Sequence, residues 1–120
     1  MPMAFSAVAD LDVVNCLRNA CEVLAVPYHV GISHSKDSFY GEVEPERMPM
    51  ANLLKERWQA WVKCGALCSE MEAAALYVIA RTLGIRAGGL MIAHGTDNSL
   101  ELLCKTAVES VRQLIRLDSN

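Results

Sequence analysis

Apolar residues along the chain alternate between helical and strand-like spacing. From Asp10 to Ala25 they recur at intervals of three and four residues, which places them on one helix face. The Asp10 carboxylate can accept hydrogen bonds from the free N–H groups of a first turn. Since Pro27 forbids continuation, we predict a helix over 10–25 with Asp10 as its N-cap, followed by a strand over 28–33.

The middle of the chain is less regular. Residues 35–50 combine Gly41 and two prolines with many charges, so we predict a long loop there, a kind of segment that often binds ligands. Residues 52–63 place their apolar side chains on one helical stripe. Residues 66–68 form a short apolar piece that is typical of a strand.

The clearest helix signal begins at Ser69. Ser69 and Glu72 have the spacing of a capping box, in which the hydroxyl accepts from the N–H of residue 72 and the carboxylate accepts from the N–H of Ser69. We predict that this helix runs to about Leu83 and ends at Gly84, the favoured residue type just after a helix.

The last third of the chain repeats the alternation. Residues 85–93 are apolar with two glycines and predict a buried strand, and residues 94–99 predict a polar turn. An amphipathic helix over 99–117 closes the chain. Its predicted inward residues are Leu102, Leu103, Thr106, Val108, Val111, Leu114 and Ile115.

Helices that separate strands predict an α/β fold, with a parallel or mixed sheet covered in three α/β/α layers. We predict one domain over 1–120. About three strands are few for such a sheet, whose usual size is about five or six. An incomplete sheet leaves edges and apolar faces bare, so we expect a partner chain, a homo-oligomer or a missing N-terminal portion.

Composition narrows the classes of function. The 120 residues are 52% hydrophobic with a net charge of −3, which gives no basic footprint for nucleic acid. The longest apolar run, Ala73 to Ala80, is far shorter than the roughly 20 residues that span a bilayer. No Lys or Arg precedes Arg18, so we expect no signal peptide, which begins with a charged segment. The five cysteines are irregularly spaced and predict no disulfide framework. We therefore expect a cytoplasmic protein without membrane, nucleic-acid or metal partners.

Candidate chemistry is concentrated where predicted strands end, because ligands of parallel α/β folds bind at the carboxyl ends of the strands. Glu70 and Glu72 bracket Met71 at such a place. The two carboxylates could accept hydrogen bonds from a polyol such as ribose while Met71 packs on the sugar. Alternatively, Glu72 only completes the capping box and Glu70 only favours the helix dipole.

Two other strand ends leave similar alternatives open. Phe39 could stack on a planar base or belong to the core. His94 and Asp97 could act as acid or base, or lie in a polar turn that caps the next helix. No glycine-rich phosphate loop is present, and Arg47 is the one arginine whose loop position favours a ligand.

Four stretches together resemble the uridine phosphorylases of the nucleoside phosphorylase-I superfamily. The resemblance extends from about Phe5 to Ile115 and implies an α/β/α fold. It also implies phosphate-dependent cleavage of a nucleoside to free base and ribose 1-phosphate, with phosphate as co-substrate and no cofactor. The stretches are residues 28–41, 58–61, 69–76 and 84–88.

The resemblance also implies roles for single residues. Phe39 would stack on the nucleobase, Met71 would pack against ribose, Glu72 would bind ribose hydroxyls and Glu70 would flank them. Family members are about twice as long and carry their phosphate site in an N-terminal half that has no counterpart here. The resemblance thus implies activity only with a complementing chain or assembly.

Three further positions depart from the family pattern. Glu42 lies near a glutamine of the uracil pocket, and Arg47 is a displaced candidate for its arginine. Asp97 corresponds loosely to the general acid of purine-type members. Two alternatives therefore stay open: a truncated, non-catalytic homologue that binds nucleosides or a partner, and a nucleosidase that uses Asp97 as its acid.

Overall fold

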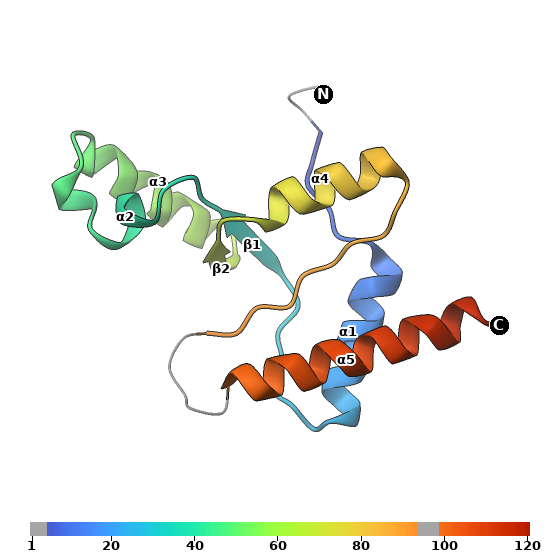
Figure 1. Ribbon diagram of the computed structural model, residues 1–120. Helices are drawn as coiled ribbons and strands as arrows, with labels where there is room; N and C mark the ends of the chain where they lie inside the picture. The colour runs from blue at the N-terminus through green and yellow to red at the C-terminus, as the bar shows by residue number, and fades with distance from the viewer. Residues whose placement is uncertain (1–4, 94–98) are drawn as a thin grey trace. The chain divides into compact units, whose positions relative to one another are not determined.

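The computed structural model describes residues 5–93 and 99–120 (Figure 1). These residues divide into two compact units, Gly31–Ala74 and the described parts of Met1–Val30 with Ala75–Asn120. The prediction of a single domain over 1–120 stays a prediction. The elements in chain order are α1 (Leu11–Val23), β1 (Ile32–Ser35), α2 (Phe39–Val43), the 3₁₀ helix η1 (Pro45–Arg47), α3 (Ala51–Lys63), β2 (Ala66–Glu70), α4 (Ala73–Leu83) and α5 (Ser99–Asp118).

A two-stranded parallel sheet is the centre of the unit 31–74. Strand β1 pairs with β2, and the register places Ser35 opposite Glu70 at the carboxyl ends. The sequence predicts both strands with shifted bounds. Residues 28–31 lie outside β1, because pairing begins only at Ile32 opposite Ala66, and the ladder then continues to Glu70.

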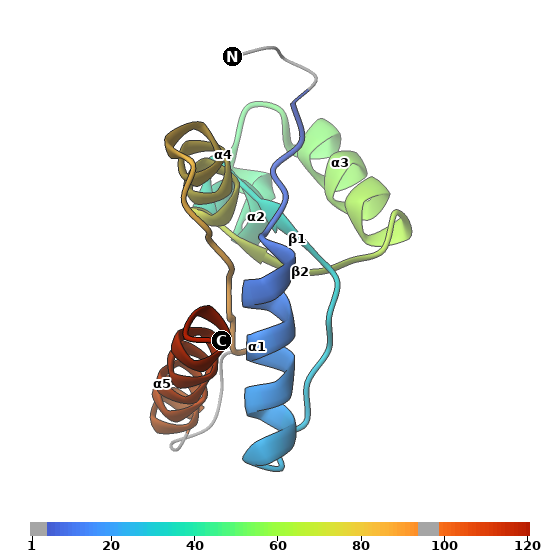
Figure 2. The same ribbon diagram turned by 90° about the vertical axis from the view of Figure 1, so that its right-hand side faces the viewer.

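Helix α3 lies beside this sheet (Figure 2) and contacts it. The rings of Trp58 and Trp61 lie 5.8 and 5.2 Å from the ring of His34 in β1, centroid to centroid. The Nδ1 atom of His34 is buried there without a hydrogen-bond partner among the described residues. The helix predicted over 52–63 is confirmed, beginning one residue earlier.

The long loop predicted over 35–50 is wrong, because it contains α2 and η1. The Ser38 hydroxyl accepts from the Gly41 N–H at 3.0 Å and caps α2. Pro45 begins η1, a position where its missing N–H costs nothing. Helices of five and three residues are too short to show an apolar period, so the sequence pattern concealed them.

In the other unit, α1 and α5 lie side by side, as both views show. The predicted N-cap is confirmed: Asp10 Oδ1 accepts from the N–H groups of Asp12 at 3.1 Å and Val13 at 3.3 Å. The buried residues of this helix pair are small. They are Cys16, Ala20 and Cys21 on α1 and Thr106 and Ser110 on α5.

The predicted inward face of α5 is only partly right. Thr106 is buried and Leu103 and Leu114 are half-buried. Larger apolar residues expected inward are instead exposed, because small side chains form the buried part of this helix pair. These exposed residues are Leu102, Val108, Val111 and Ile115.

The strand predicted over 85–93 is also wrong: these residues form neither helix nor strand. A strand needs a neighbour to pair with, and the described part of this unit contains none. The segment instead contacts α1: the Asp10 N–H donates to the Ala87 carbonyl at 2.8 Å. A Cβ at Gly88 would lie 2.5 Å from Val13 Cγ1, so only glycine permits this approach.

Candidate functional site

The carboxyl ends of β1 and β2 form one edge, where Ser35 and Glu70 are register partners. The Lys36 N–H donates to the Glu70 carbonyl at 2.8 Å, which continues the pairing by one bond. The chain leaves β1 toward Phe39 and leaves β2 directly into Met71. The residues predicted to bind base and ribose therefore follow strands that end together, which is where parallel α/β folds bind ligands.

The Glu70 carboxylate is surrounded by hydrogen-bond donors. Its Oε1 accepts from the hydroxyls of Ser33, at 3.3 Å, and Ser35. Its Oε2 accepts from the backbone N–H groups of Glu72 at 2.7 Å and Ala73 at 2.6 Å. Burial by itself would raise the pKa of Glu70, but these four donors outweigh it and hold that pKa below its ordinary value.

The predicted capping box of Ser69 and Glu72 is wrong. Ser69 lies inside β2, and its hydroxyl donates to Glu42 at 2.6 Å. The Glu72 carboxylate accepts from the Met71 N–H at 3.1 Å instead of reaching back to Ser69. Because α4 begins only at Ala73, Glu70 is the residue placed to cap it.

Met71 and Glu72 are both accessible. Met71 is 42% exposed, and Glu72 is exposed as well. Among the described residues, the Met71 N–H provides the one hydrogen bond to the Glu72 carboxylate. Most of the acceptor capacity of this carboxylate therefore remains available to a ligand.

Phe39 opens α2 and is 51% exposed, so it is not a core residue. The Tyr40 ring meets it edge-on, with the centroids 5.4 Å apart and the planes at 86°. The Lys36 Nζ lies 5.4 Å from the centroid of the Phe39 ring, over its face. The aromatic surface predicted to stack on a base is thus present and has a cation beside it.

Glu42 forms a half-buried ion pair. Its Oε1 lies 3.0 Å from the Lys36 Nζ, and its Oε2 accepts from the Ser69 hydroxyl at 2.6 Å. The exposed fractions of the two charged side chains are 11% for Lys36 and 20% for Glu42. This carboxylate therefore links α2 to the ends of both strands.

The remaining predicted residues are placed differently. The Arg47 side chain is 74% exposed and pairs with Glu44. His94 and Asp97 lie outside the described residues. Ser33, Ser35 and Lys36 were not predicted as site residues, although the two serines share one strand face through their spacing of two.

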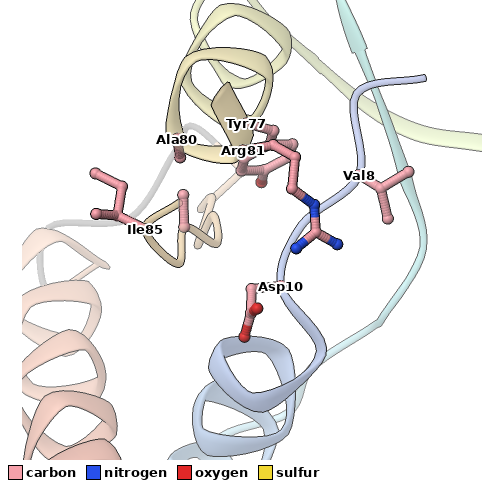
Figure 3. Close-up of a pocket in the computed structure, with 7 residues that line it drawn as sticks. Val8, Asp10, Tyr77, Ala80, Arg81 and Ile85 are labelled. Atoms are coloured by element: carbon pink, nitrogen blue, oxygen red, sulfur yellow. The ribbon is translucent and has the colours of Figure 1, made fainter. Parts of the chain in front are cut away.

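A hollow in the other unit is lined by α4, the segment before α1 and residues 85–87 (Figure 3). Its volume of about 10 Å³ suits a single water molecule. Figure 3 shows Arg81 and Asp10 beside it. This hollow is too small for a nucleoside.

Within 5–93 and 99–120, no group of three or more His, Cys, Asp or Glu side chains is arranged to hold a metal ion. No helix of that part of the chain is both long and apolar enough to cross a bilayer.

Comparison with known proteins decides the family. The family model described as the phosphorylase superfamily matches residues 2–117. The chain belongs to the phosphorylase superfamily. A uridine phosphorylase of Treponema pallidum is 34% identical, over 98% of this chain and 50% of that protein. A uridine phosphorylase of Thermococcus kodakarensis is 44% identical, over 70% of this chain and 31% of that protein.

The structural comparison agrees with this membership. A solved structure titled as the P knowlesi homologue of P falciparum PNP has a TM-score of 0.79 and 28% identity, covering 97% of this chain and 47% of that one. The predicted fold class, a partial α/β nucleoside phosphorylase fold, is thereby confirmed. This phosphorylase-superfamily chain spans about half the length of the Treponema pallidum protein and of the solved structure.

Proposed function

We propose that this chain carries the nucleoside-binding part of a uridine phosphorylase-like enzyme. The observation that carries the proposal is the pairing of Ser35 with Glu70, which makes β1 and β2 end at one edge. Phe39 follows one strand, and Met71 and Glu72 follow the other, all with exposed side chains. Its relatives named as uridine and purine nucleoside phosphorylases support the same reaction class.

In the proposed reaction, Phe39 stacks on the base, Met71 packs against ribose and Glu72 accepts hydrogen bonds from the ribose hydroxyls. A phosphate oxygen bonds to C1′ while the C1′–N bond breaks, and the base leaves with the electron pair and gains a proton. Glu72 orients the sugar and is not the nucleophile. Positioning and electrostatics therefore supply most of the rate enhancement.

The phosphate-binding groups would come from outside the described residues. Glu70 already occupies the start of α4 with a carboxylate, so this helix terminus offers no place for an anion. Many large apolar side chains are exposed, among them Leu11 on α1 and Leu100 on α5. This surface supports association with a complementing chain or with further copies, which would provide the phosphate site.

Uracil release from uridine by the 120-residue chain, with and without phosphate, tests the proposal. Calorimetric titration with uridine and inosine would accompany it. Glu72→Gln is the test variant, and Glu56→Gln, at an exposed position on α3, is the matched control. Phosphate-dependent release that only Glu72→Gln abolishes would support the proposal.

The other outcomes separate the alternatives. Nucleoside binding without release would identify a binding homologue that needs a complementing chain for catalysis. Release that does not depend on phosphate would identify a nucleosidase. Absence of both binding and release would contradict the proposed function.

A further inference from the structure

The strongest unassigned feature is the completeness of the hydrogen bonds around Glu70. An ionised carboxylate offers about four acceptor positions. Glu70 uses them for two serine hydroxyls on Oε1 and two backbone N–H groups on Oε2. No acceptor position remains for a hydroxyl of a sugar.

Ser35 extends this arrangement by one residue. Its hydroxyl donates to Glu70 Oε1 and accepts from the Ala74 N–H at 2.9 Å. Glu70 and Ser35 together satisfy three consecutive N–H groups, those of Glu72, Ala73 and Ala74. Such N–H groups at the start of a helix have no partner within the helix, so these bonds fix the backbone that carries Met71 and Glu72.

Glu72 presents the opposite case. It is exposed, and its one hydrogen bond from the described residues is the Met71 N–H at 3.1 Å. Its carboxylate therefore has free acceptor positions for the two adjacent hydroxyls of a ribose. The two carboxylates of the Glu-Met-Glu stretch differ in what they can still bind.

We propose that Glu70 and Ser35 are positioning residues, which hold Met71 and Glu72 in place for ribose without touching the sugar. This inference rests on the proposed function. A carboxylate whose acceptor positions are filled by strand and helix donors acts through the backbone that it fixes. Small displacements of a binding group weaken binding strongly, which makes such support effective.

Calorimetric titration of the full chain with uridine and with 2′,3′-dideoxyuridine tests the proposal. The dissociation constant for 2′,3′-dideoxyuridine divided by that for uridine measures recognition of the ribose hydroxyls. We expect Ser35→Ala to weaken uridine binding by about tenfold, the factor that 1.4 kcal/mol represents, and to lower this ratio. Ser35→Thr keeps the hydroxyl and should restore the ratio. Ser33→Ala, which removes only a 3.3 Å hydrogen bond, should have a smaller effect.

A double variant separates positioning from direct contact. Glu72→Gln should remove most of the discrimination, and adding Ser35→Ala to it should change the ratio no further. Discrimination that persists in Glu72→Gln and disappears with Ser35→Ala would overturn the inference, because the Glu70 arrangement would then contact the sugar. An unchanged ratio in Ser35→Ala would also overturn it.

Amide hydrogen exchange verifies that the variants stay folded. In Ser35→Ala the N–H groups of Glu72, Ala73 and Ala74 should exchange faster, while those in the middle of α3 should keep wild-type protection. Equal protection of all three N–H groups in both proteins would overturn the inference. If the wild-type chain binds neither uridine nor inosine, the proposed function itself fails, which is distinct from binding with the wrong response to Ser35→Ala.

Discussion

Ser35 and Glu70 face each other across two parallel strands, and the hydroxyl of Ser35 donates to the carboxylate of Glu70. The same carboxylate accepts from the N–H groups of Glu72, which precedes α4, and of Ala73, its first residue. One hydrogen-bonded group therefore joins β1, the end of β2 and the beginning of the next helix. The predicted ribose-binding residues, Met71 and Glu72, lie between these attachment points.

Glu70→Gln should make folding stability less dependent on pH. The pKa of Glu70 is lowered in the folded chain, so its ionisation stabilises the fold above the unfolded pKa of about 4.3. That contribution is lost as pH falls through the lower, folded pKa. Urea unfolding between pH 7 and pH 3 should show a difference between wild type and variant that shrinks below about pH 4.3. Glu56→Gln provides the control, and a difference that stays constant with pH would contradict the assignment.

Asp10→Ala should destabilise the unit that contains α1. The variant loses the carboxylate that accepts from the N–H groups of Asp12 and Val13. Loss of such a cap costs about 1 kcal/mol in the free energy of unfolding, which urea denaturation can measure. Asp10→Asn retains an oxygen at the same place and should restore most of the stability. Equal losses in both variants would argue against capping.

Gly88→Ala should destabilise the chain through overlap with α1. The new Cβ would lie 2.5 Å from Val13 Cγ1, and overpacking of this kind costs about 1–3 kcal/mol. Val13→Ala removes the opposing atom, so the double variant should be less destabilised than the sum of the two single variants. Thermal unfolding of all four proteins measures this coupling. Strict additivity would show that the two residues do not meet.

Lys36→Met should destabilise the unit 31–74 more than Glu42→Gln does. Removal of the lysine leaves the half-buried Glu42 carboxylate with Ser69 as its remaining partner, whereas Glu42→Gln keeps an amide oxygen that can still accept from the Lys36 ammonium. Loss of one partner of such a pair costs about 1–3 kcal/mol. The double variant should recover part of the loss, as chemical denaturation can show. A double variant that is less stable than Lys36→Met would contradict this explanation.

The longer helices were the most predictable elements of the described residues. Asp10 and Gly84 have direct local signals, because a cap or a left-handed residue depends on the nearest backbone: Asp10 accepts from the first turn of α1, and Gly84 has a φ of +68° just after α4. The strand prediction over 85–93 was wrong because apolar content does not specify a strand without a neighbour to pair with. The loop prediction over residues 39–47 was wrong because very short helices show no periodic spacing of apolar residues.

The candidate site also has a part that the sequence predicted and a part that depends on tertiary structure. The sequence by itself determined the family resemblance and the position of Phe39, Met71 and Glu72 after predicted strands, because both depend on local order along the chain. Only the tertiary structure decided that Glu70, and not Ser69 with Glu72, caps α4. The hydroxyls of Ser33 and Ser35, which lie 37 and 35 residues from Glu70 in sequence, donate to the capping carboxylate and hold it in place. Strand register brings these side chains together, and no local pattern encodes that register.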